Sequence, residues 1–162
     1  MNYDKFLSNL ATLGPIGMLP APGTMGSLVA VILGGLITIN LGLGTLVIIL
    51  ALVTILGFPA ANAHYRLTGV KDSGSVVIDE VIGQWLPLLI IPMLPSYSLK
   101  YGAALIFSFV LFRFFDILKY GLVKKAEKLP GAYGVIADDV IAGILAGLCL
   151  FIGYKIYFYS MG

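Results

Sequence analysis

Five of the eight acidic residues lie inside long apolar stretches or at their ends: Asp79, Glu80, Asp116, Asp138 and Asp139. An unpaired carboxylate in such surroundings is strongly unfavourable, even after the protein relaxes. Ionisable residues in membrane-type sequence therefore usually mark an ion, substrate or proton site. The sequence predicts a polar site, filled by a metal ion, in an otherwise apolar protein.

The adjacent pairs Asp79-Glu80 and Asp138-Asp139 supply four of these carboxylates. Neighbours on a helix point about 100° apart, so each pair directs only one carboxylate fully into a helix bundle. Two such helices still give a four-carboxylate cluster, whose like charges call for protonation or divalent cations. Oxygen ligands favour a hard ion, above all Mg²⁺. Either pair alone also fits a solvated helix start, where acids complement the helix dipole.

Arg113 and Asp116 are three residues apart on one predicted helix face and could simply pair with each other. Apolar residues surround Arg113, however, and a guanidinium held there suits bidentate phosphate binding. The turn at residues 20–27 opens a helix and offers free backbone N–H groups with the hydroxyls of Thr24 and Ser27, so a phosphate could dock there. His64 is either an interfacial residue without a role or a helper in acid-base chemistry.

The composition places these residues in a membrane protein. The 162 residues are 59% hydrophobic and 11% charged, with a mean hydropathy of +1.01, and they fit one domain, residues 1–162. The net charge of +2 is too small to indicate nucleic acid binding. The single cysteine, Cys149, is predicted to pack in an apolar core, and no feature fixes an oligomeric state.

About 20 apolar residues span a bilayer, and the chain offers four or five such segments. The tract of residues 26–58 is expected to break at Asn40–Gly44 into two helices, because Asn and Gly tolerate a tight turn. Three further spans are predicted at residues 76–94, 101–118 and 135–158, the first of them kinked or shortened by Pro87 and Pro92. Gly143 and Gly147 predict a small-residue contact inside the bundle.

The distribution of basic residues predicts how a protein with five spans is oriented in the membrane. The N-terminal tail and the predicted loops at residues 59–75 and 119–134 share one side and hold seven basic residues: Lys5, Arg66, Lys71, Lys119, Lys124, Lys125 and Lys128. The other side holds only Lys100 and Lys155. This split predicts that the N-terminus and both loops are cytoplasmic. The acidic pairs, Arg113 and the residue 20–27 turn should then converge on one membrane face.

Four segments resemble, in order, the motif set of the phosphatidylglycerophosphatase A family. They are residues 21–28 (APGTMGSL), 72–83 (DSGSVVIDEVIG), 112–119 (FRFFDILK) and 134–143 (GVIADDVIAG). The resemblance implies a Mg²⁺-dependent phosphatase of the bacterial inner membrane that converts phosphatidylglycerophosphate, an anionic phospholipid, into phosphatidylglycerol.

Chemistry and resemblance together assign roles to the polar residues. Asp79, Glu80, Asp138, Asp139 and Arg113 are the expected catalytic residues, and the metal ligands are expected among Asp79, Glu80, Asp116, Asp138 and Asp139. The phosphate is expected at Thr24, Ser27, Arg113, Lys119 and His64. Water activated by Mg²⁺ is the favoured nucleophile, with an aspartate as the alternative.

A small cation- or proton-coupled transporter is the alternative function, because intramembrane acids also build ion pathways. The predicted clustering of the acids toward one face, without a ladder across the bilayer, favours the enzyme. A third interpretation, a non-catalytic assembly subunit, would leave four polar motifs without a role.

Overall fold

The computed structural model of the chain describes residues 3–71, 73–93 and 99–161, and every regular element in these ranges is helical. The elements in chain order are α1 (Tyr3–Ala11), η1 (Gly14–Met18), α2 (Pro22–Leu41), α3 (Leu43–Thr68), α4 (Ile78–Leu88), η2 (Ile91–Met93), α5 (Leu99–Leu118), α6 (Leu122–Ala126) and α7 (Ala132–Met161). The predicted all-α fold is confirmed.

Four helices, α2, α3, α5 and α7, are long and apolar enough to cross a membrane. Their outer surfaces carry large apolar side chains that the protein leaves exposed, such as Ile55, Ile106 and Ile156. Exposed apolar side chains along helices of this length are suited to contact with lipid. The protein is therefore an integral membrane helical bundle.

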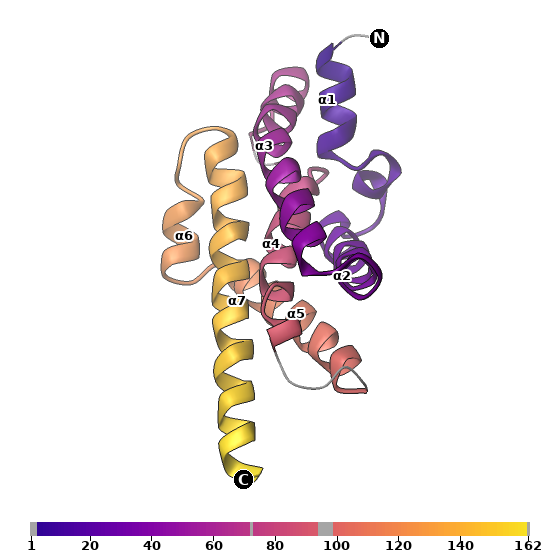
Figure 1. The fold of residues 1–162 in the computed structure, drawn as a ribbon. Helices are drawn as coiled ribbons and strands as arrows, with labels where there is room; N and C mark the ends of the chain where they lie inside the picture. The colour runs from indigo at the N-terminus through magenta and orange to yellow at the C-terminus, as the bar shows by residue number, and fades with distance from the viewer. Residues whose placement is uncertain (1–2, 72, 94–98, 162) are drawn as a thin grey trace.

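The short helix α4 lies at the centre of this bundle, among α2, α3, α5 and α7 (Figure 1). Nearly all of its eleven residues are buried, which explains why its sequence is apolar on several faces. Pro87 lies in its last turn, and the helix ends one residue later. The span predicted over residues 76–94 is thus shortened, as its prolines indicated, and its last residue, 94, lies outside the described ranges.

Glycines set the other helix boundaries. Gly42, with φ of 87°, separates α2 from α3 within the predicted break. The predicted loop over residues 59–75 is wrong in its first half, because α3 continues through Pro59 to Thr68. The residues after Pro59 include good helix formers, and the helix ends only where Gly69 adopts a left-handed conformation with φ of 73°.

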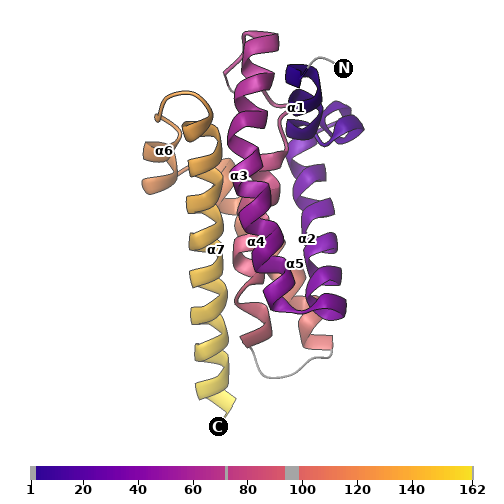
Figure 2. The same ribbon diagram turned by 45° about the horizontal axis from the view of Figure 1, so that its top comes forward.

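One end of the bundle gathers the polar segments. The starts of α2, α4 and α7 and the ends of α3 and α5 lie toward the end where α1 and α6 are found (Figure 2). We call this the α1–α6 end. The predicted convergence of the four motifs on one end of the bundle is confirmed.

The position of Cys149 differs from the predicted packing in the protein core. Its side chain is exposed on the surface of α7 and does not lie in the protein core. Segment hydropathy could not separate these two cases, because a lipid-facing helix surface is as apolar as a core.

The fold predicts that the two ends of the bundle lie on opposite sides of the membrane. In a Cys149→Ala background, Asn40→Cys at the α2–α3 turn and Lys124→Cys on α6 should react with an impermeant maleimide from opposite sides. The excess of basic residues at the α1–α6 end predicts that Lys124→Cys faces the cytoplasm, so it should react only after the membrane is opened. Labelling of both variants in intact cells would contradict this arrangement.

Candidate active site

Three carboxylates, two of them from buried residues and one from a partly buried residue, meet where α4 crosses α7. Asp79 and Glu80 lie in the first turn of α4, and Asp139 lies in α7. One carboxylate oxygen from each residue lies within 4.8 Å of the others. Asp79 is 7% exposed and Asp139 is 4% exposed, so the cluster is largely removed from solvent.

Two glycines bring the carboxylates together. Gly83 follows Asp79 by four residues, and Gly143 follows Asp139 by four, so each glycine shares a helix face with its aspartate. A Cβ atom on Gly143 would lie 2.2 Å from the carbonyl oxygen of Gly83, and one on Gly83 would lie 2.7 Å from that of Asp139. The helices can cross this closely only because both positions lack a side chain. The predicted contact of Gly143 inside the bundle is confirmed.

The cluster leaves carboxylate oxygens without partners. Within the described part of the chain, Glu80 Oε2 and Asp139 Oδ2 are buried and accept no hydrogen bond. Asp79 Oδ1 accepts one from the backbone N–H of Glu80, at 3.1 Å. Buried carboxylates this close together require a cation or protons. The unpartnered oxygens and the all-oxygen donor set fit a hard divalent cation.

Arg113 of α5 joins the start of α2 to this region. Its Nη1 donates to Ser27 Oγ at 3.3 Å and its Nη2 donates to Thr24 Oγ1 at 3.3 Å. Nη1 also forms an ion pair with Asp116, while its buried Nε has no partner among the described residues. Both interpretations of Arg113 therefore have support, since it pairs with Asp116 and also contacts the proposed phosphate-docking hydroxyls.

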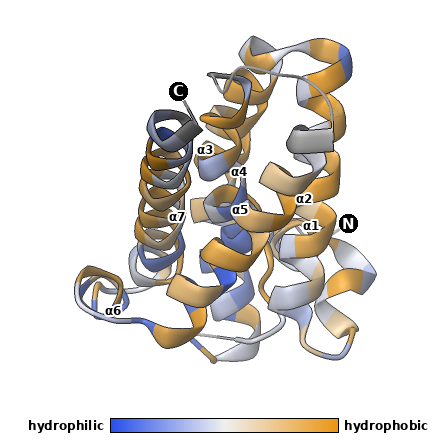
Figure 3. Cartoon of the chain, turned by 90° about the horizontal axis from the view of Figure 1, so that it is seen from below, coloured by the Kyte–Doolittle hydropathy of each residue, from blue (hydrophilic) through white to orange (hydrophobic). Residues whose placement is uncertain are grey.

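Gly23 allows Glu80 and Arg113 to approach the first turn of α2. A Cβ atom on Gly23 would lie 2.2 Å from Glu80 Oε1 and 3.4 Å from Arg113 Nη1. The carboxylate cluster, the guanidinium and the N-terminal turn of α2 are thus neighbours. Figure 3 shows hydrophilic segments toward the middle of the bundle, with hydrophobic surfaces around them.

Lys119 forms a second polar group with Glu127 and Asp138. Its Nζ donates to Glu127 Oε1 at 2.9 Å and to Asp138 Oδ2 at 2.7 Å. Partial burial lowers the pKa of Lys119, but the two carboxylates raise it further, so its pKa lies above the usual value. The hydrogen bond from Lys119 holds the pKa of Glu127 below its usual value. Lys119 therefore remains a cation at neutral pH.

His64 contacts a different part of the molecule. It is buried in α3, where Ser8 Oγ of α1 lies 2.9 Å from Nδ1 and Ser75 Oγ lies 3.2 Å from Nε2. These contacts join α1 and the segment before α4 to the end of α3. The role of His64 in substrate binding stays a prediction.

The structure separates the predicted acids into three groups. Asp79, Glu80 and Asp139 form the cluster, Asp116 pairs with Arg113, and Asp138 pairs with Lys119. Sequence patterns did not single out Glu127 or Lys71 as site residues, although both line a pocket together with Asp138. Both belong to charged loops, where most such residues are simply solvated, and only their proximity to α7 distinguishes them.

The fold and site define an integral membrane protein with a buried acidic centre at one end of its helices. Residues 9–154 match the model of the phosphatidylglycerophosphatase A family. A Haemophilus influenzae protein named phosphatidylglycerophosphatase A is 37% identical over 162 residues, which cover 93% of this chain and 96% of that protein. The chain belongs to the phosphatidylglycerophosphatase A family.

Two further relatives are similar to most of this chain, and one of them carries the same name. An Escherichia coli protein with the same name is 35% identical over 136 residues, covering 82% of this chain and 74% of that protein. A Bacteroides thetaiotaomicron protein named putative phosphatidylinositol-3-phosphatase is 40% identical over 128 residues, covering 76% and 77% of the two chains. No solved structure matches the chain.

The close approach at Gly23 predicts a specific effect of a single methyl group. Gly23→Ala should displace the Glu80 carboxylate and lower phosphatase activity by about 100-fold, since small misplacements of reacting groups have effects of this size. Thermal stability should change little, because the displaced atom ends a flexible side chain. The matched control is Gly153→Ala on α7, where nothing lies within 4 Å of the new Cβ. Equal activities of the two variants would contradict this geometry.

Proposed function

We propose that this protein hydrolyses the terminal phosphomonoester of phosphatidylglycerophosphate in a Mg²⁺-dependent reaction, giving phosphatidylglycerol and inorganic phosphate. The observation that carries the proposal is the buried cluster of Asp79, Glu80 and Asp139 next to Arg113 and the start of α2. Family membership and the names of two relatives support the substrate.

The metal assignment rests on the chemistry of the cluster. Asp79, Glu80 and Asp139 would hold the ion, because Mg²⁺ prefers carboxylate oxygens and two of theirs are buried without partners. A bound Mg²⁺ would supply Lewis-acid polarisation of the phosphoryl group and neutralise developing charge. Asp116 and Asp138, engaged by Arg113 and Lys119, remain further candidate ligands.

The surrounding groups would bind and orient the phosphate. Arg113 can neutralise charge on the transferring phosphoryl group, and Asp116 holds its guanidinium in place. Thr24 and Ser27 lie at the N-terminal turns of α2, where a helix favours anions. A carboxylate of the site would accept the proton of the attacking water. The close packing of α4 against α7 would limit the access of bulk water to the site.

The proposed location is the bacterial inner membrane, with several membrane crossings and the active site on the cytoplasmic side. The seven basic residues assigned to the α1–α6 end support this orientation through the positive-inside rule. Basic residues at the same end would also attract the anionic headgroup of the substrate.

The proposed activity can be tested with purified protein in detergent. Inorganic phosphate should be released from phosphatidylglycerophosphate with Mg²⁺, without any ion gradient, and release should stop with excess EDTA. Asp139→Asn and Glu80→Gln should each lower turnover at least 100-fold, in line with losses at charge-stabilising sites. Asp4→Asn, which changes a carboxylate outside the site, is the matched control. Normal turnover in EDTA would contradict metal dependence, while gradient-dependent ion flux without phosphate release would favour a transporter.

The role of Arg113 can be separated from its pairing with Asp116. A phosphate clamp needs the planar, bidentate guanidinium, so Arg113→Lys should lower turnover strongly although the charge is kept. A purely structural pair predicts that lysine largely substitutes and that Arg113→Met with Asp116→Leu restores activity. Steady-state kinetics and thermal stability in detergent distinguish the two. Substantial activity in either variant would contradict the clamp.

A further inference from the structure

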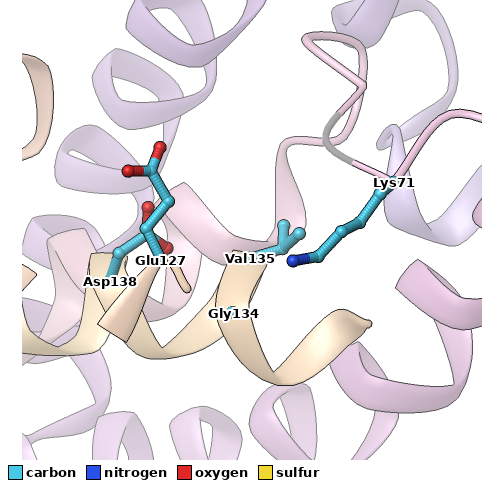
Figure 4. Close-up of a pocket in the computed structure, with 5 residues that line it drawn as sticks. All are labelled: Lys71, Glu127, Gly134, Val135 and Asp138. Atoms are coloured by element: carbon cyan, nitrogen blue, oxygen red, sulfur yellow. The ribbon is translucent and has the colours of Figure 1, made fainter. Parts of the chain in front are cut away.

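A small pocket lies beside Asp138, between the first turns of α7 and the segments that carry Lys71 and Glu127. It is partly open, with a volume of about 90 Å³, below the range of pockets that hold drug-sized ligands, and it is lined by Lys71, Glu127, Gly134, Val135 and Asp138. Figure 4 shows the carboxylates of Glu127 and Asp138 on one side and the amine of Lys71 on the other. Asp138 directly precedes Asp139, so the pocket adjoins the proposed reaction centre.

Asp138, which lines the pocket, carries an unused buried acceptor. Asp138 is 3% exposed, and its Oδ1 has no hydrogen-bond partner in the described structure, whereas its Oδ2 accepts from Lys119. A buried carboxylate oxygen without a donor is unfavourable. A ligand that donates a hydrogen bond to Oδ1 would remove this penalty.

The charges around the pocket favour an uncharged hydrogen-bond donor over an anionic group. Glu127 and Asp138 are balanced by Lys71 and by Lys119, which binds both carboxylates. A phosphate entering here would face two carboxylates, while a hydroxyl group can donate to them and accept from lysine. Lys71 donates to the carbonyl oxygen of Leu129 at 2.9 Å, and an ammonium has three donors in all.

Packing holds the wall of the pocket in place. A Cβ atom on Gly134 would lie 2.5 Å from the carbonyl oxygen of Leu129 and 2.7 Å from that of Glu127. The segment that carries Glu127 therefore sits directly on the first turn of α7. A site this closely packed can distinguish ligands by the hydrogen bonds they complete.

We propose that this pocket binds the uncharged polyol part of the lipid headgroup, with a free hydroxyl donating to Asp138 Oδ1. The inference rests on the proposed function and adds the basis of its headgroup selectivity. The names of two relatives refer to a glycerol-based and an inositol-based headgroup, and both kinds of headgroup carry free hydroxyls. Lys71 and Glu127 complete the pocket and select for the hydroxyl.

The test compares phosphatidylglycerophosphate with its synthetic analogue in which propane-1,3-diol replaces glycerol, which removes only the secondary hydroxyl. The wild-type protein should show a kcat/KM at least about tenfold higher for the hydroxylated lipid, because the analogue leaves the buried acceptor unpaired. Lys71→Met and Glu127→Gln should bring this ratio toward one. The matched control Lys128→Met, on an exposed residue outside the pocket lining, should keep the wild-type ratio.

The outcomes separate the two proposals. Equal kcat/KM values of the wild-type protein for the two lipids would overturn the polyol pocket and leave the phosphatase activity intact. An unchanged ratio in both Lys71→Met and Glu127→Gln would likewise overturn the assignment of the pocket. Absence of phosphate release from both lipids would instead contradict the proposed function.

Discussion

The structure depends on holding several carboxylates at the buried crossing of α4 and α7. Such a cluster is unstable in an apolar bundle unless its charge is compensated. Gly83 and Gly143 bring the two helix backbones together, and the aspartates one turn before each glycine are carried into the same space. The glycines that allow the crossing therefore also determine the geometry of the acids.

The end of α5 supplies two cations to the same end of the bundle. Arg113 reaches the first turns of α2 and pairs with Asp116, while Lys119, just after the helix, bridges Glu127 and Asp138. Lys119 adopts a left-handed backbone conformation with φ of 46°, which is uncommon for a residue with a side chain. One helix end thus places a guanidinium and an ammonium at two separate acidic groups.

Much of this organisation could be predicted from the sequence, because a membrane imposes simple rules. Helix length, the Asn40–Gly44 break and the distribution of lysines determined the spans and the shared end of the polar motifs. The grouping of the acids could not be predicted, because it depends on side-chain direction at each helix crossing. The pairing of Asp138 with Lys119, the position of Glu127 and the contacts of His64 with Ser8 and Ser75 all required the three-dimensional structure.

The central claim is that Asp79, Glu80 and Asp139 form one binding site for a divalent cation. The most direct measurement is binding of Mn²⁺, as a spectroscopic substitute for Mg²⁺, to the purified protein by electron paramagnetic resonance without substrate. The account predicts Mn²⁺ binding that Mg²⁺ displaces and that Asp139→Asn weakens at least about tenfold, as expected for loss of a charged ligand. Equal Mn²⁺ affinity in the wild-type protein and Asp139→Asn would contradict it.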